Sequence, residues 1–155
     1  LLVKGIVHPD KKCPFAAVAV VAMDLTRINL RLIAGTTEPL SEKVSLAERP
    51  GLIPATEHAD LIAVFNGGFK ALHGQYGMML GGKIFLPPRD IACTVALYRD
   101  GTLRIRTWPN VSTTQSDMVA YRQTPPCLVE QNTMNDKLTE STKNWGATVS
   151  GETVI

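Results

Sequence analysis

Residues 92–108 read ACTVALYRDGTLRIRTW and carry the strongest structural signal in the chain. Apolar and polar side chains alternate on both sides of Asp100-Gly101, as they do in strands that bury one face. An Asp-Gly pair favours the tight turn of a β-hairpin, because both residue types tolerate the positive φ angles that this turn requires. The stretch therefore predicts that residues 92–99 pair antiparallel with residues 102–108.

Three further pairs of apolar runs flank short turn sequences, and each pair predicts another hairpin. They are residues 16–23 with 27–34, Met78–Leu80 with residues 83–85, and Ala147–Val149 with residues 153–155. We expect residues 153–155 to be paired or buried, since β-prone residues after a glycine turn resemble an interrupted strand. Most elements are therefore expected to be strands joined by tight turns.

Other segments predict one more strand, a helix and an irregular connection. Residues 61–65 form a short apolar run, which indicates a buried strand leading into a tight loop at Asn66-Gly67-Gly68. Residues 114–122 begin with a motif similar to a capping box and continue at helical spacing, which predicts a helix. Residues 35–54 are expected to form an exposed connection. The expected class is α+β, with a large, mostly antiparallel or mixed sheet and few short helices.

Length and charge limit the possible functions. The 155 residues suit one domain, residues 1–155, and no linker rich in Pro, Ser or Gly divides them. The net charge is +2, and acidic and basic side chains are interspersed, so no block of like charge would follow a nucleic-acid backbone. The longest apolar run, residues 15–23, is far shorter than the roughly 20 residues of a membrane helix. We therefore expect neither a nucleic-acid partner nor a membrane span.

The three cysteines are too few and too widely spaced for a disulfide scaffold or a Cys-x-x-Cys metal site. Free thiols and a single bridge both remain open, because buried thiols behave as small apolar side chains. If a bridge forms, we expect it between Cys93 and Cys127, since both lie in strand-like segments while Cys13 lies in a polar stretch. Their Cα atoms should then be less than about 7 Å apart.

A family resemblance follows from residues 61–69, which read LIAVFNGGF, and from Tyr76-Gly77-Met78-Met79 and Gly82-Lys83. This order resembles the phosphodiester glycosidase family, which includes the enzyme that uncovers mannose-6-phosphate by removing N-acetylglucosamine. The strands around Asp100-Gly101 and residues 125–129 are similar to later parts of the family pattern. An Arg-containing strand and an Asp-Gly-Gly-type motif that complete the family's site are not in this sequence. The resemblance therefore implies the amino-terminal part of one such domain, incomplete at its C-terminus.

The Asn66-Gly67-Gly68 loop is the first candidate site. The amides of Gly67 and Gly68 could form an anion-binding nest after a buried strand, with no side chains to block approach. Such a loop suits a phosphodiester, and the resemblance favours this function, with Asn66 among the residues that support turnover. The alternative is a plain turn in which Asn66 hydrogen-bonds its own backbone.

Basic side chains near this loop are candidates for proton transfer and phosphate binding. His73 lies in an irregular loop, where an imidazole that titrates near neutrality can act as general acid toward a leaving oxygen. Arg89 can hold a phosphate bidentately and is presented by Pro87-Pro88, and Lys83 is a further candidate. The alternatives are a surface histidine and solvated charges.

Carboxylates and aromatic rings supply the remaining candidates. Glu130 and Asp90 could provide the carboxylates of glycosidic chemistry, although Asp90 is more often a turn residue. Tyr76, Phe69 and Trp108 could stack on a sugar ring or belong to the core. No His-x-His, His-Glu-x-x-His or Asp/His cluster occurs in the sequence, so we expect no metal site and no cofactor.

Together these features favour a hydrolase that acts on a sugar-phosphate diester or a related glycosidic linkage. The alternative is a non-catalytic carbohydrate-binding or structural subunit that keeps the fold, since resemblance in fold does not establish activity. The expected ligand is a sugar-phosphate or a polysaccharide, and a second chain or a further C-terminal segment is expected to complete the domain. We expect an extracytoplasmic protein, either periplasmic or secreted.

Overall fold

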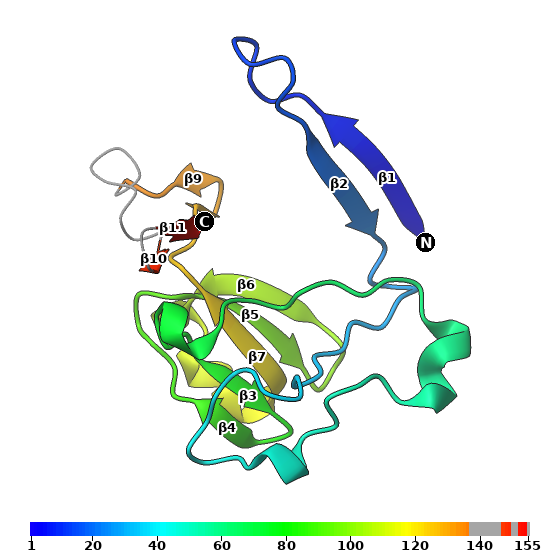
Figure 1. Cartoon of the computed structure of the whole chain (residues 1–155), viewed down its shortest axis with the longest axis vertical. Helices are drawn as coiled ribbons and strands as arrows, with labels where there is room; N and C mark the ends of the chain where they lie inside the picture. Colours follow the sequence, from blue (N-terminus) through cyan, green and yellow to red (C-terminus); the bar gives the residue numbers. More distant parts are fainter. Residues whose placement is uncertain (137–146, 150–151, 155) are drawn as a thin grey trace. The chain divides into compact units, whose positions relative to one another are not determined.

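The computed structural model describes residues 1–136, 147–149 and 152–154, which fall into two units, Leu1–Arg31 and Leu32–Ile155. The first unit is a hairpin of β1 (Leu2–Val7) and β2 (Val18–Met23), shown in blue in Figure 1. The two strands pair antiparallel along their whole length.

The predicted pairing of residues 16–23 with residues 27–34 is wrong, because β2 pairs with β1 and residues 27–34 form no strand. The turn at Asp24 is formed as a local motif, in which the Asp24 carboxylate accepts hydrogen bonds from the amide and hydroxyl of Thr26. It does not lead into a return strand. The entropic cost of closing a longer loop grows slowly with loop length, so the more distant apolar run at β1 competes successfully.

The second unit is built on a five-stranded sheet in the order β4-β3-β7-β5-β6, with every neighbouring pair antiparallel (Figure 1). Its strands are β3 (Met78–Leu80), β4 (Lys83–Leu86), β5 (Cys93–Tyr98), β6 (Leu103–Thr107) and β7 (Met118–Thr124). The hairpins predicted across Gly81-Gly82 and Asp100-Gly101 are both confirmed. At the second turn the Asp100 carboxylate accepts hydrogen bonds from the amide and hydroxyl of Thr102.

The helix predicted over residues 114–122 is wrong. A 3-10 helix, η5 (Ser112–Asp117), ends at Asp117, and the chain then continues as β7, the central strand of the sheet. A central strand is buried on both faces, so its sequence lacks the alternation of a half-exposed strand and can imitate helical spacing. The described residues contain strands and 3-10 helices and no α-helix, so the fold is mostly antiparallel β.

Two apolar clusters lie on opposite faces of the sheet, because neighbouring residues of a strand point to opposite sides. On one face Tyr121 packs against Trp108 of η4 (Trp108–Asn110), with ring centroids 5.0 Å apart. On the other face Met78 and Phe85 pack with Ala34 and Val44. The remaining members of the first cluster are Met79, Ala96, Tyr98, Val111 and Met118.

Residues 35–54 were predicted to form an exposed connection, but part of this segment packs into the core together with Ala34. Val44 is buried, and the buried Arg49 donates hydrogen bonds to the carbonyls of Thr37 and Val44 with its guanidinium 5.3 Å from the Phe85 ring centroid. Most of the other side chains here are exposed, including those of η1 (Leu46–Glu48). The segment is therefore a strap, anchored at a few points.

The expectation of a buried strand at residues 61–65 is also wrong. These residues follow a 3-10 helix, η2 (Ala55–Asp60), and form no strand, and Val64 is 65% exposed. An apolar run can be a buried strand only if other strands pair with it, and none does so among the described residues.

A disulfide joins Cys93 to Cys127, with a Cα–Cα distance of 4.6 Å, which confirms the expected pairing. Cys13 is a free thiol. The bond ties the start of β5 to the segment beyond β7, which continues into the short hairpin of β8 (Val129–Glu130) and β9 (Thr133–Met134).

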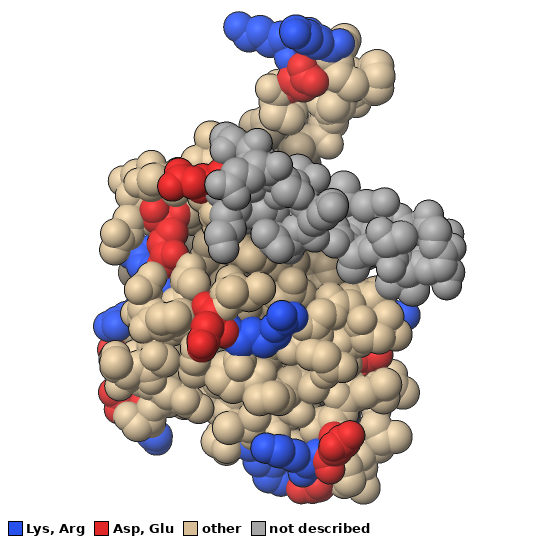
Figure 2. Space-filling model, turned by 90° about the vertical axis from the view of Figure 1, so that its left-hand side faces the viewer, with Lys and Arg blue, Asp and Glu red and all other residues tan. Residues whose placement is uncertain are grey.

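At the end of the chain, β10 (Ala147–Val149) pairs antiparallel with β11 (Glu152–Val154), as the predicted hairpin requires. The turn residues 150–151 and Ile155 lie outside the described residues. No helix in the described part of the chain is long and apolar enough to cross a membrane. Figure 2 shows one face of the molecule, on which acidic and basic side chains are interspersed with uncharged surface.

Replacing both Cys93 and Cys127 with Ser should lower the free energy of unfolding by about 3–4 kcal/mol, since the bond closes a loop of sequence separation 34. Denaturant titration of the oxidised protein and the double variant measures the difference. Cys13→Ser is the control and should change stability by less than about 0.5 kcal/mol. Equal stability of the double variant and the oxidised protein would contradict the prediction.

Tyr121→Phe should raise the free energy of unfolding by about 1 kcal/mol, because the buried Tyr121 hydroxyl has no hydrogen-bond partner among the described residues. Burial raises the pKa of Tyr121 from 10.0 to about 12. Because the folded state disfavours the phenolate, this group does not change the stability with pH below pH 10.0, and the free energy of unfolding falls as the pH rises from 10.0 toward 12.

Unfolding measured from pH 9 to 12 should consequently show a smaller alkaline loss for Tyr121→Phe than for the unmodified protein. The matched control is Tyr98→Phe, which removes a hydroxyl that does form a hydrogen bond, to Thr114 Oγ1 at 2.8 Å. That control should lose about 1 kcal/mol instead. A loss of stability in Tyr121→Phe comparable to that of the control would show that the Tyr121 hydroxyl has a partner.

Candidate functional site

Arg122 organises the loop that contains the predicted glycine-rich site. Its side chain leaves β7 on the face that carries Met78, and only 8% of it is exposed. The guanidinium donates hydrogen bonds to the carbonyls of Tyr76, at 2.6 Å, and Gly77, at 3.2 Å, and also to that of Phe69. One buried side chain therefore holds both ends of the loop from Phe69 to Gly77.

Gly68 is required by this arrangement. Its φ is +144°, a conformation that residues with a Cβ rarely adopt. A Cβ at this position would lie 2.8 Å from Arg122 Nε, closer than atoms in contact can approach. The glycine therefore makes room for the Arg122 side chain beneath the loop.

Gln123, which is completely buried on the opposite face of the sheet, holds the backbone at Gly77 and Arg89. Its Oε1 accepts hydrogen bonds from the amides of Gly77, at 3.0 Å, and Arg89, at 2.8 Å. Its Nε2 donates to the Arg89 carbonyl at 3.2 Å and to Thr94 Oγ1 at 3.0 Å. A Cβ on Gly77 would lie 2.7 Å from Gln123 Oε1, so this glycine too permits a close approach.

Arg89 is an exposed residue on a fixed backbone. The Gln123 side chain hydrogen-bonds the backbone amide and carbonyl of Arg89. The Arg89 guanidinium donates to the Gly74 carbonyl and lies 5.5 Å from the centroid of the Tyr76 ring. Tyr76 also packs against Phe69, with ring centroids 6.0 Å apart. The chain of contacts from Phe69 through Tyr76 thus links Arg89 to the glycine-rich loop.

Asn66 forms a local turn, as the alternative interpretation of the motif anticipates. Its Oδ1 accepts a hydrogen bond from the Gly68 amide at 3.1 Å. Asn66 and Gly67 are exposed and Gly68 is partly exposed. The Gly68 amide is consequently already engaged, and the Gly67 amide is the nest donor that no hydrogen bond among the described residues occupies.

His73 ends a short 3-10 helix, η3 (Ala71–His73), which begins two residues after Phe69. The imidazole is partly exposed and makes no side-chain hydrogen bond or ion pair within the described part of the chain. It lies beside Gly74, whose carbonyl accepts from Arg89. His73 is therefore in the same loop as the other candidates and accessible to solvent.

Lys83 and Glu130 lie in other parts of the sheet. Lys83 begins β4 at the Gly81-Gly82 turn and forms a 2.8 Å ion pair with Glu48. The hydrogen bond from Lys83 is the main reason that the pKa of Glu48 falls to about 2. Arg89 lies beyond the other end of β4, and an extended chain rises by about 3.3 Å per residue, so Lys83 is remote from it.

Glu130 acts as a tie between β8 and β6. It accepts hydrogen bonds from the amide and hydroxyl of Thr107 and from Asn110 Nδ2. Burial opposes ionisation, but the hydrogen bonds from Thr107 and Asn110, with the nearby Arg106, lower the pKa of this carboxyl group. Within the described part of the chain, no contact of Glu130 joins it to the loop around Asn66.

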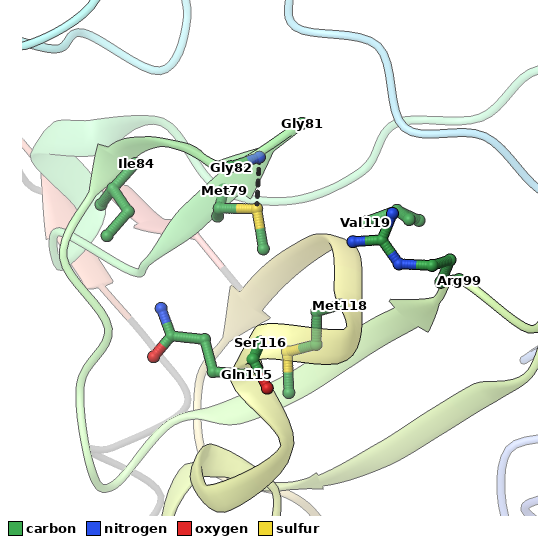
Figure 3. Close-up of a pocket in the computed structure, with 9 residues that line it drawn as sticks. All are labelled: Met79, Gly81, Gly82, Ile84, Arg99, Gln115, Ser116, Met118 and Val119. Carbon is green, nitrogen blue, oxygen red and sulfur yellow. Dashed lines mark hydrogen bonds between the residues drawn. The ribbon is translucent and has the colours of Figure 1, made fainter.

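A cavity of about 570 Å³ opens beside the Gly81-Gly82 turn (Figure 3). Figure 3 shows Arg99 and Gln115 on opposite sides of this space, with the thioethers of Met79 and Met118 between them. It is further lined by Gly81, Gly82, Ile84, Ser116 and Val119. None of the residues that the sequence singled out for binding or catalysis lines it.

Sequence reasoning missed Arg122 and Gln123, because it assigned Arg122 to a helix. The available signal was the pair of polar residues within the apolar stretch of residues 118–123, since polar residues in a buried strand need partners. Comparison of the chain with protein-family models, curated proteins and solved structures found no match.

Gly68→Ala should lower the free energy of unfolding by about 1–3 kcal/mol, because it combines an unfavourable φ with a clash against Arg122 Nε. Gly67→Ala is the matched control, since its Cβ would meet only Leu32 Cδ1 at an ordinary 3.5 Å. Thermal and denaturant unfolding of both variants measure the difference. Equal effects of the two substitutions would refute the role given to Gly68.

Proposed function

We propose that the loop from Asn66 to Gly77 and Arg89 form an anion site that binds the phosphate of a sugar-phosphate diester. The observation that carries this proposal is the presentation of Arg89: the backbone is held by Gln123, and the guanidinium is stacked on Tyr76. A fixed backbone reduces the entropy lost when a side chain binds its ligand. A guanidinium can donate two parallel hydrogen bonds to phosphate oxygens.

The adjoining groups suit a sugar. The partly exposed Phe69 ring offers apolar surface to a pyranose, and it packs against Tyr76, which is itself buried and contacts the Arg89 guanidinium. The exposed Asn66 can hydrogen-bond to a ligand through its carboxamide, and the Gly67 amide remains a donor. Lys83 and Glu130 are occupied elsewhere and are not part of this proposal.

The proposed reaction is hydrolysis of the diester at the sugar side, in line with the resemblance to the phosphodiester glycosidase family. Within this site His73 is the candidate proton donor to the leaving oxygen, since it is partly exposed and beside the Arg89 contact. A further segment or second chain would complete the catalytic groups. The disulfide is consistent with an extracytoplasmic protein, and we propose a periplasmic or secreted location.

The competing function is a module that binds an anionic carbohydrate without cleaving it. A specific observation favours it: the Gly68 amide is already bonded to Asn66, and Gly68 makes room for Arg122. The motif would then serve the fold, and only Arg89 would serve the ligand. Hydrolysis is the property that separates the two functions.

Arg89→Ala should weaken binding of a sugar-phosphate diester by about one to two orders of magnitude, because it removes a charge-assisted hydrogen bond of about 1.5–3 kcal/mol. Arg104→Ala is the matched control, since Arg104 is also an exposed arginine stacked on a tyrosine, at 4.8 Å from the Tyr98 ring centroid. Calorimetric titration with N-acetylglucosamine-1-phosphate methyl diester, at constant ionic strength, measures both variants.

The same diester tests hydrolysis, and release of N-acetylglucosamine is the readout. Under the hydrolase proposal, Asn66→Ala and His73→Gln each lower turnover while binding persists. Binding without detectable release would favour the non-catalytic module. Equal binding by Arg89→Ala and the unmodified protein would exclude this site from either function.

A further inference from the structure

Arg122 is a buried charge without a matching carboxylate. Among the described residues, the hydrogen-bond acceptors of its guanidinium are all neutral backbone carbonyls, those of Phe69, Tyr76 and Gly77. It forms no ion pair with any carboxylate in the described part of the chain. A buried charge is normally paired, because removing it from water is costly. A guanidinium nevertheless stays protonated in proteins, so Arg122 carries its positive charge beneath the loop.

The negative group that acts on Arg122 is Glu38, which lies in the strap that covers this face of the sheet. One oxygen of its carboxylate, Oε2, accepts hydrogen bonds from the amides of Ala71, at 3.0 Å, and Leu40, at 3.1 Å. Burial lowers the pKa of Arg122, and the attraction of Glu38 partly opposes that fall. Glu38 therefore acts through space, from the N-terminal end of η3, on the charge beneath the loop.

We propose that Arg122 adds a buried positive potential at the Asn66–Gly77 loop to the exposed charges of Lys70 and Arg89, and that a singly charged anion bound there supplies the missing negative charge. This inference rests on the proposed function. It adds Arg122 to the anion site and states that the site prefers a singly charged anion. Arg122 acts at a distance, because its hydrogen bonds are directed at the loop carbonyls. Glu38 limits the attraction, since it competes with the ligand for the same positive potential.

The protein interior around Arg122 screens its charge weakly, so the electrostatic potential of Arg122 extends to the loop. Electrostatic interactions through the protein interior are less screened than those through water. A Cβ at position 68 would lie 2.8 Å from Arg122 Nε, so the loop backbone lies close to the guanidinium and little protein separates the charge from the outer surface of the loop. The Arg89 guanidinium, which hydrogen-bonds to the Gly74 carbonyl of this loop, adds a positive charge that can touch the ligand.

The distinguishing experiment removes a negative charge and seeks a gain in affinity. Dimethyl phosphate, a monoanionic diester, is the probe, and trimethyl phosphate is its neutral counterpart of similar shape. Glu38→Gln should tighten dimethyl phosphate binding by about three- to tenfold, while trimethyl phosphate binding stays unchanged. The glutamine Oε1 can still accept from the Ala71 and Leu40 amides, so the strap keeps its hydrogen bonds.

Glu48→Gln is the matched control, because it changes the net charge equally at an exposed site paired with Lys83. Its dimethyl phosphate affinity should differ by less than about twofold from that of the unmodified protein. Titrations followed by the backbone amide signals of the full chain, at one low ionic strength, give all the dissociation constants.

Arg122 itself is tested by two variants. Arg122→Met should lower dimethyl phosphate affinity by about tenfold or more, and Arg122→Lys, which keeps the charge but loses the fork of donors, should lose less. Since both variants remove hydrogen bonds to the loop and can unfold it, the Glu38→Gln result decides independently of them.

The outcomes separate this inference from the proposed function. If Arg89→Ala weakens dimethyl phosphate binding but Glu38→Gln leaves it unchanged, the anion site stands and the role of Arg122 is wrong. If Glu48→Gln tightens binding as much as Glu38→Gln, the effect is one of net charge, and the role of Arg122 is again wrong. If the unmodified protein does not bind dimethyl phosphate, both proposals fail.

Discussion

The need to satisfy two buried polar side chains on the central strand determines how one end of the sheet is built. Arg122 and Gln123 are adjacent on β7 and point to opposite faces, and β3 and β5 enclose the strand on both sides. Unpaired polar groups in such a place cost about 1–3 kcal/mol each, and more when charged. The loop from Phe69 to Gly77 supplies carbonyls to Arg122, and the backbone at Arg89 supplies an amide and a carbonyl to Gln123.

This constraint changes the meaning of the glycines in the loop. A glycine-rich turn after an apolar run suggests backbone amides open to a ligand, yet the space that a Cβ would fill at Gly68 and Gly77 is occupied by the side chains of Arg122 and Gln123. Structural and ligand-binding roles are nevertheless compatible. A loop fastened from below presents its outer surface, and the neighbouring Arg89 that stacks on the buried Tyr76, with little conformational freedom.

Charged side chains elsewhere act mainly as ties between segments that are distant in sequence. Glu130 connects the segment beyond β7 to the end of β6, close to the Cys93–Cys127 bond, since Cys93 pairs with Thr107 in the sheet. Arg49 fastens the strap to the face that carries Phe85. A sheet with many tight turns and little regular helix therefore relies on such contacts to hold its irregular connections.

The elements that contiguous residues encode were predictable from the sequence, namely the hairpins across Gly81-Gly82 and Asp100-Gly101. Residue context also indicated that Cys93 would pair with Cys127 if a bridge formed, although not that one would form. In each hairpin the turn residues and the alternating side chains lie within a few positions of one another, so local physics determines the pairing. The strand character of β7 and the burial of Arg122 were not predictable in this way, nor was the exposure of residues 61–65. A strand needs partners from far along the chain, and residues 118–124 gain theirs from β3 and β5 whereas residues 61–65 gain none in the described structure. The candidate site shows the same distinction. The sequence alone could indicate Asn66 and Arg89 by residue type. Only the tertiary structure could place Arg122 and Gln123 beneath them, because hydrogen bonds between distant segments leave no local sequence pattern.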